Sequence, residues 1–480
     1  MRQVLLLIII ISLHYTARSQ IKQVKRIDGS SISTKQIDEL VQQLMDTAEV
    51  TGICIGVLND NKPVYVKTYG YKDKEKGELI DTATVFYAAS FSKSLFAFVV
   101  MQLVQEGSLD LDKPLYQYLP KPIPEYENYK DLEGDERWKL ITARHCLSHT
   151  TGFPNWRNLN PHGNKKLEIF FKPGERYAYS GEGLVLLQLV VETVTGKSVE
   201  ILAREKVFLP FNMPNTSYQW QPEFEKNHAL GYDVTGAPLR KYRTRPVNAA
   251  GSLETTIADY SRFISAVLQG KGLSQQSKAE MFRPQIPILT RRQFPSLNND
   301  TTSENKKIQL SYGLGWGLLR SPYGRAFFKE GHDDGWEHFN INFMDKGISL
   351  IMMTNSSNGE SIFKEMLEKV IGDTFTPWQW EGYFPYFAYR DLPAKETVNY
   401  IGTYKMGEMP AVISAENGKL YIEAETGGVK KQKLYLLKGD RFRLREFPVE
   451  IEFIKDVNGN VTKMIAWVEG KERNEFIRVE

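Results

Sequence analysis

The order of helical and strand-like patterns constrains the fold of this chain more than any other feature of the sequence. Ser33 and Gln36 form a predicted capping box, and apolar residues then recur at helical spacing up to Met45. Strand-like runs follow at residues 52–59 and 63–71, helical patterns dominate residues 90–209, strands return between residues 313 and 354, and a helix at residues 361–370 ends the unit. We therefore predict one antiparallel sheet with members from both ends of this unit, flanked by helices and with an all-helical lobe beside it.

The last part of the chain has a different pattern. Short apolar runs alternate with the turn sequences Asn417-Gly418, Gly427-Gly428, Gly439-Asp440 and Asn458-Gly459. These turns predict an all-β domain, a meander or small barrel, at residues 397–480. We expect an aromatic linker at residues 377–396 and an α/β (α+β) domain at residues 20–376.

The N-terminus is typical of an export signal. Arg2 precedes an apolar run at residues 4–13, and Ala17-Arg18-Ser19 resembles a cleavage site, so we expect a signal peptide at residues 1–19. The alternative is an uncleaved anchor, but the run is shorter than the ~20 residues that a spanning helix needs. An exported protein, periplasmic or extracellular, with no membrane span after processing is the expectation.

Composition and charge exclude several classes of function. Hydrophobic residues make up 41 % of the chain, which indicates folded rather than disordered protein. The net charge is only +3, from 61 basic and 58 acidic residues without a long run of one sign, so we expect no nucleic-acid partner. Cys54 and Cys146 are the two cysteines, and neither their number nor their spacing suggests a metal site. We expect two buried free thiols.

The sequence Ser90-Phe91-Ser92-Lys93 is the strongest candidate for a catalytic site. Sequences of the form S-x-x-K also begin at Ser19, Ser303 and Ser361, but only this one heads a run, residues 95–104, that is apolar nearly all round. A helix would place Ser90 and Lys93 on one side. Burial would lower the pKa of Lys93, so that its neutral amine accepts the Ser90 proton, and the helix N-terminus would offer N–H groups to an oxyanion. The alternative is an N-cap serine with a surface lysine.

Together with several other blocks, this motif resembles the serine β-lactamase and penicillin-binding-protein superfamily, class C branch. Residues 106–112, the stretch 141–152 that ends in His149-Thr150-Thr151-Gly152, and Ala249-Ala250-Gly251 are similar to blocks of that family, and the resemblance spans residues 33–372. It implies a transpeptidase-like fold and acyl transfer without a metal or an organic cofactor.

The resemblance also implies roles for residues of a second motif, Y-x-N. Tyr179 matches the tyrosine that helps to activate the serine, and an adjacent ammonium would lower its pKa. Gly181 stands where the family has the asparagine that contacts the substrate amide. Alternatively, Tyr179 is a core residue beside a helix start.

A third family motif, K-T-G or H-x-G, provides a cation for the substrate carboxylate and an N–H for the oxyanion hole. We assign it to His332-Asp333-Asp334-Gly335, with His332 as the cation and Gly335 as the N–H donor. The alternative is a plain turn between strands. His332, Asp333, Asp334 and His338 are a weaker alternative as metal ligands, and we expect His149 to be structural, with both ring nitrogens hydrogen-bonded.

The sequence thus predicts a serine hydrolase that acts through an acyl-enzyme on a small-molecule or peptide-like ester or amide, with a cell-wall fragment as one candidate. One alternative is a true β-lactamase or D-Ala-D-Ala carboxypeptidase. Another is a catalytically inactive module that binds a ligand in the cleft. The sequence leaves the oligomeric state open.

Overall fold

The computed structural model describes residues 22–239, 243, 246–383, 392–424, 429–444, 449–468 and 472–479. The predicted signal peptide, residues 1–19, lies outside the described residues. Within the described part, no helix is long and apolar enough to cross a membrane.

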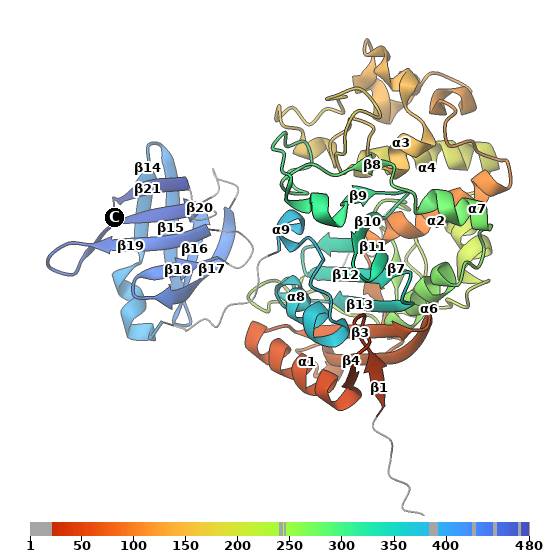
Figure 1. The fold of residues 1–480 in the computed structure, drawn as a ribbon. Coiled ribbons are helices and arrows are strands. Elements are labelled where there is room, and N and C mark those ends of the chain that lie inside the picture. Colours follow the sequence, from red (N-terminus) through yellow and green to blue (C-terminus); the bar gives the residue numbers. More distant parts are fainter. Residues whose placement is uncertain are drawn as a thin grey trace, which may run out of the picture.

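The larger body is built on an antiparallel sheet in which strands from both ends of the unit meet, as the sequence predicts (Figure 1). In spatial order its described strands are β5 (Glu78–Leu79), β4 (Lys62–Asp73), β3 (Gly52–Asn59), β13 (Ile348–Thr354), β12 (Trp336–Phe343), β11 (Gly324–Asp333), β10 (Gly317–Ser321), β9 (Ser311–Tyr312) and β8 (Ile286–Pro287). The pairing of β3 with β13 joins the early hairpin to the late strands.

Both faces of the sheet are covered, and the residues of β3 show how. Ile53, Ile55 and Val57 belong to one hydrophobic core, whereas Cys54 and Leu58 belong to the other, as expected for side chains that alternate along a strand. The first core lies under α1 (Thr34–Ala48), α8 (Phe363–Met366) and the π-helix Leu367–Ile371; the second lies under α2 (Phe91–Gln105) and α6 (Ile257–Leu268). This arrangement explains why the central strands are apolar throughout.

The predicted capping box at the start of α1 is confirmed. The Gln36 N–H donates to Ser33 Oγ, and the Ser33 N–H donates to Gln36 Oε1 at 3.1 Å. Two N–H groups at the helix N-terminus are therefore satisfied locally, and α1 begins at the residue that the sequence indicates.

The helical lobe, drawn in orange and yellow in Figure 1, lies next to the end of the sheet that carries β8. It contains α3 (Ala143–Leu147), α4 (Gly181–Thr195), α5 (Val199–Ala203) and several short 3₁₀ turns between residues 115 and 159. Helix α2 contacts both α5 of this lobe and β11 of the sheet, and α7 (Gln275–Met281) packs on α2. The N-terminus of α2 is thereby placed where lobe and sheet meet.

A two-stranded pair fixes the turn that leads into α2. Strand β6 (Phe86–Tyr87) pairs with β7 (Glu254–Thr255), and the Ala88 N–H donates to Leu253 O. A similar small pair, β1 (Gln23–Lys25) with β2 (Ser31–Ser33), precedes α1. The β6–β7 pair brings the loop at residues 249–253 against the residues just before Ser90.

The C-terminal part forms an all-β barrel. Its described strands are β14 (Gly402–Met406), β15 (Met409–Glu416), β16 (Lys419–Ala424), β17 (Val429–Lys438), β18 (Arg441–Arg443), β19 (Val449–Lys455), β20 (Val461–Val468) and β21 (Glu472–Arg478). Pairing of β14 with β21 closes the barrel, and Tyr404, Phe442 and Phe453 pack inside it. Of the two forms left open by the sequence, the barrel is the one observed.

The beginning of the predicted aromatic linker is part of the larger body instead. Trp378, Trp380 and Tyr383, in and just after α9 (Trp378–Glu381), are buried in the core that includes α1. Trp380 Nε1 donates to Thr290 Oγ1 at 3.1 Å, and Tyr383 OH donates to Ser361 O at 2.8 Å. The expected linker thus begins too early in the sequence, because its large aromatic side chains are more stable buried than in water.

These contacts predict the outcome of truncation. A chain that ends after Asp391 should fold and keep the thermal unfolding temperature of the larger body. A chain that ends after Thr376 should lose several kcal/mol of stability, because each large buried side chain contributes about 1.5–3 kcal/mol. Calorimetry on both chains measures the difference; aggregation of the longer one would mean that the barrel is needed for folding.

Candidate active site

Ser90 and Lys93 lie at the buried N-terminus of α2. Lys93 Nζ is 2.9 Å from Ser90 Oγ and donates to Ala250 O at 2.6 Å. Lys93 is only 1 % exposed, and the helix is buried from Phe91 to Leu103, which excludes the alternative of a surface lysine. Ala89, directly before Ser90, has a φ of 44°, so the chain turns sharply into the helix there.

The surroundings of Lys93 favour the neutral amine. Burial holds the pKa of Lys93 well below its usual value, and the positive charge of Lys329 lowers it further. A neutral amine has a lone pair that can accept the Ser90 proton. The direction of this shift is the one expected from the sequence.

Tyr179 is the third candidate catalytic residue, and it lies beside Lys93. Lys93 Nζ lies 5.1 Å from the centroid of the Tyr179 ring, and the hydroxyl accepts a hydrogen bond from Lys329 Nζ at 3.0 Å. Burial, together with the negative charge of Glu330, raises the pKa of Tyr179 well above its usual value. The expected lowering by an adjacent ammonium is therefore wrong, because burial outweighs it, and the phenol keeps its proton in the resting site.

The cation beside Tyr179 is Lys329, a residue that the sequence-based assignment missed. Lys329-Glu330-Gly331 lies on β11 and has the K-x-G form of the third motif. A Cβ on Gly331 would lie 2.9 Å from Ala88 O, so glycine lets β11 pack closely against the turn before Ser90. The signal was present in the sequence, three residues before His332.

His332 and Gly335 do not occupy the positions expected for them. Strand alternation places His332 on the face of β11 opposite to Lys329. The Gly335 N–H donates to Ser357 Oγ at 2.8 Å in the turn between β11 and β12, and the φ of Gly335 is 82°. The alternative reading, a turn joining two strands, describes this segment correctly.

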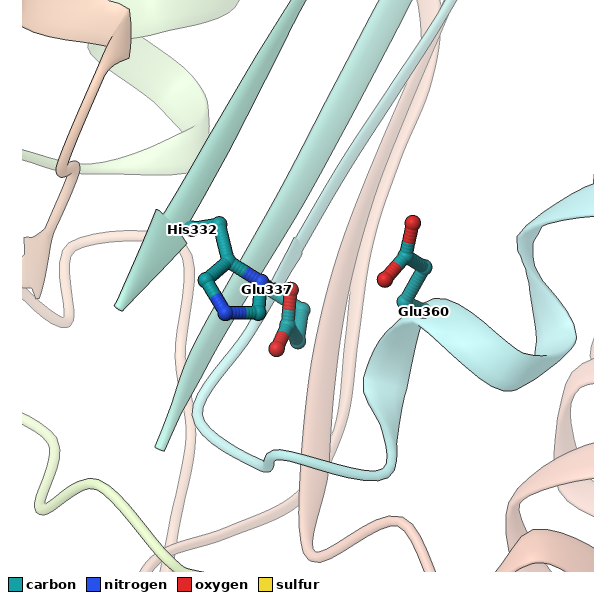
Figure 2. A group of neighbouring side chains, drawn as sticks. All are labelled: His332, Glu337 and Glu360. Atoms are coloured by element: carbon teal, nitrogen blue, oxygen red, sulfur yellow. Dashed lines mark hydrogen bonds and ion pairs between the residues drawn. The ribbon is translucent and has the colours of Figure 1, made fainter. Parts of the chain in front are cut away.

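Figure 2 shows His332 together with Glu337 and Glu360, whose nearest potential ligand atoms lie within 4.8 Å of one another. His332 Nδ1 donates to Glu337 Oε2 at 2.6 Å, and the negative charge of Glu337 raises the pKa of His332 to about 10. These groups could hold a divalent cation only if the imidazolium lost its proton. His338, the other histidine considered, instead donates from Nε2 to Tyr87 O at 2.8 Å and accepts from the Thr354 N–H.

Gly181, at the start of α4, leaves room for an indole ring. A Cβ at this position would lie 2.5 Å from Cη2 of Trp156, and Lys93 Nζ lies 5.6 Å from the centroid of that ring. The Gly181 N–H donates to both Asn155 O and Asn155 Oδ1 at 3.0 Å. The space near the asparagine position of the family is thus filled by Trp156.

His149 holds the segment that carries Tyr179. Its Nδ1 accepts from the Ser180 N–H at 3.1 Å, its carbonyl accepts from the Ala178 N–H, and its ring lies 4.3 Å from that of Tyr179. Burial holds the pKa of His149 well below its usual range, so the ring is neutral. Nε2 has no partner among the described residues, which differs from the expectation that both nitrogens are hydrogen-bonded.

A cavity of about 710 Å³ adjoins the site. Tyr87, Trp156, Gly251 and Ser252 contribute to its walls, and Tyr87 OH donates to Gly251 O at 2.5 Å. A larger cavity, of about 1320 Å³, is lined by residues of α2 and α7 and contains none of the candidate catalytic groups. Ser90, Lys93, Tyr179 and Lys329 line neither cavity, but the smaller one is bounded by Trp156, whose ring centroid lies 5.6 Å from Lys93 Nζ, so it is the nearer candidate for binding a substrate.

The fold defines the class of protein: an antiparallel sheet with a helical lobe, of the serine β-lactamase and penicillin-binding-protein type. The chain belongs to the Beta-lactamase family, whose model matches residues 37–371.

Individual relatives agree with this assignment. The chain is 26 % identical over 436 residues to penicillin-binding protein 4* of Bacillus subtilis (strain 168), which covers 81 % of this chain and 87 % of that protein. It is 25 % identical over 218 residues to protein flp of Staphylococcus aureus (strain N315), covering 43 % of this chain and 42 % of that protein.

Solved structures share the fold. The octameric penicillin-binding protein homologue from Pyrococcus abyssi gives a TM-score of 0.57 at 19 % identity, over 93 % of this chain and 100 % of that chain. D-alanine carboxypeptidase AmpC from Burkholderia cenocepacia gives a TM-score of 0.54 at 19 % identity, over 69 % of this chain and 97 % of that chain. At these identities the likeness concerns the fold alone.

The packing at Gly181 generates a prediction. Gly181→Asn should destabilise the protein by about 1–3 kcal/mol, because the new side chain overlaps Trp156. Adding Trp156→Ala should remove this penalty, so that the double variant unfolds at a temperature no lower than Trp156→Ala alone. Thermal unfolding of the three variants tests the coupling; a Gly181→Asn protein as stable as the parent would show that the ring does not fill this space.

Proposed function

We propose that this protein is an exported serine hydrolase that cleaves an ester or amide through an acyl-enzyme on Ser90. One observation carries the proposal: the buried Lys93 amine lies 2.9 Å from Ser90 Oγ, and burial holds its pKa well below that of an ordinary lysine. A base whose neutral form is favoured and that contacts a serine hydroxyl is what nucleophilic catalysis requires.

The proposed reaction begins with transfer of the Ser90 proton to Lys93 as Ser90 Oγ attacks the substrate carbonyl carbon. The C–O or C–N bond to the leaving group then breaks, and the leaving group receives the proton from the Lys93 ammonium, either directly or by way of the Tyr179 hydroxyl, which passes on one proton as it takes up another. Water then adds to the ester on Ser90 and gives up a proton to Lys93; the bond between the acyl carbon and Ser90 Oγ breaks, Oγ takes that proton back from Lys93, and the acid is released. Neither a metal nor an organic cofactor is part of this scheme.

Backbone N–H groups near Ser90 are available to bind the oxyanion. The Ser90 N–H donates to no protein acceptor among the described residues. In the same part of the structure, β10 pairs with β11 only as far as Phe328, so the edge of β11 that begins at Lys329 is not covered by β10. We assign the oxyanion site to the Ser90 N–H and to this edge of β11, in place of Gly335.

A second candidate is a β-lactamase or D-Ala-D-Ala carboxypeptidase, and the presence of Lys329 beside Tyr179 favours it. The names of two similar proteins, a penicillin-binding protein and a D-alanine carboxypeptidase, also support this second candidate. Turnover of a chromogenic cephalosporin and release of D-alanine from an acyl-D-Ala-D-Ala peptide separate this candidate from a general esterase or amidase. A binding module would do neither and would not be acylated.

The assignment of the nucleophile is tested by covalent labelling. A fluorophosphonate probe should label the protein once, at Ser90, and Ser90→Ala should lower ester hydrolysis by about a thousandfold or more. Ser361→Ala and Ser303→Ala are matched controls, because each of these serines also precedes a lysine by three residues. An adduct mapped to either control serine would contradict the assignment.

The role of Lys93 predicts a pH profile. Because the neutral amine is the active form, the rate should fall as pH drops through the pKa of Lys93, on a limb well below the pKa of an ordinary lysine. Lys93→Arg replaces the neutral amine by a permanent cation that cannot act as a base, and it should lower acylation by about 10²- to 10⁴-fold at every pH. Initial rates of ester hydrolysis give the profile; full activity of Lys93→Arg would rule out the proposed base.

A further inference from the structure

Every N–H bond of the Lys329 ammonium is already used within the protein. Nζ donates to Tyr179 OH at 3.0 Å, to Glu330 O at 3.1 Å and to Glu330 Oε1 at 2.6 Å. The Lys329 side chain is 0 % exposed. An ammonium has three protons, so none remains for a substrate carboxylate in this arrangement.

The Glu330 carboxylate, which accepts a hydrogen bond from Lys329 Nζ, is itself held in place by other contacts. Gln293 Nε2 donates to Glu330 Oε1 at 3.1 Å. The backbone N–H of Gln293 donates to Trp380 O at 2.8 Å, so the buried α9 segment holds the residue whose side chain contacts Glu330. The Glu330 side chain is 14 % exposed. Glu330 is therefore a fixed negative charge beside Lys329 rather than a mobile surface residue.

Among the residues that the structure describes, the other groups around Ser90 supply no compensating positive charge. Burial favours the neutral forms of Lys93, His149 and Tyr179. Burial also lowers the pKa of Lys329, the Glu330 carboxylate opposes that shift, and the positive charge of Lys329 is paired with Glu330. A substrate carboxylate would meet a paired lysine and a second carboxylate in a poorly solvated place, where like charges repel strongly.

We propose that Glu330 is a specificity-determining residue that makes this site select substrates with an uncharged group beside the scissile bond and reject those with a free carboxylate there. The substrate class would be esters and amides whose leaving group is neutral, such as an internal or capped peptide bond. This inference rests on the proposed function, because it assumes that Ser90 is acylated.

Two esters of phenylacetic acid that differ in one group provide the test. One has a 3-carboxyphenyl leaving group and the other a 3-carbamoylphenyl leaving group, so they differ at neutral pH mainly in charge. The parent protein should prefer the carbamoyl ester in kcat/KM by about tenfold or more. Glu330→Gln keeps an acceptor for Lys329 but removes the negative charge, and it should shift the ratio by about tenfold toward the carboxyl ester.

Two further variants complete the design. Glu330→Thr introduces the threonine of the family motif and should shift the ratio in the same direction, which covers the case that Glu330→Gln does not fold. Glu360→Gln removes a carboxylate of the His332 group in Figure 2 and should leave the ratio unchanged.

The outcomes separate the two proposals. A parent protein that prefers the carboxyl ester, or a ratio that neither Glu330 variant changes, would overturn the role of Glu330 while leaving the serine hydrolase intact. A parent protein that hydrolyses neither ester and takes up no probe at Ser90 would overturn the proposed function and this inference with it.

Discussion

The candidate site depends on burying one amine. Lys93 is enclosed by α2, by the loop that offers Ala250 O and by the rings of Trp156 and Tyr179. A lysine in water would be an ammonium, so the surrounding apolar residues are what make the neutral form accessible. The apolar helix α2 shields Lys93 Nζ from water. The β6–β7 pair holds the loop with Ala250 O against Nζ.

The parts of the site that are local in sequence could be predicted from it. Ser90 and Lys93 are three residues apart on a helix whose burial is evident from its composition, and the order of the patterns indicated the sheet. The contact between Gly181 and Trp156 is different, because nothing in either segment indicates that they meet in space. The absence of a side chain at Gly181 and the large ring of Trp156 become related only when the fold brings the two residues together.

Two errors in the sequence-based prediction have physical causes that could have been recognised. In a strand, residues 329 and 332 start from opposite faces, and it is the Lys329 side chain that reaches Tyr179, whereas His332 pairs with Glu337. Likewise, the run that contains Trp378, Trp380 and Tyr383 is too rich in large apolar side chains to remain in solvent as a linker, and all three are buried.

The charges of the resting site also bear on how it could favour the transition state over the bound substrate. Burial favours the neutral form of Lys93, and Lys329 is paired with Glu330, so among the described residues no unpaired positive charge is available to hold a substrate in the ground state. In the proposed reaction, proton transfer from Ser90 would create the Lys93 ammonium at the moment when the substrate carbonyl oxygen becomes negative. The two charges would appear together, so their attraction would exist only once the reaction has begun. Stabilisation of that kind lowers the barrier without tightening the binding of the substrate.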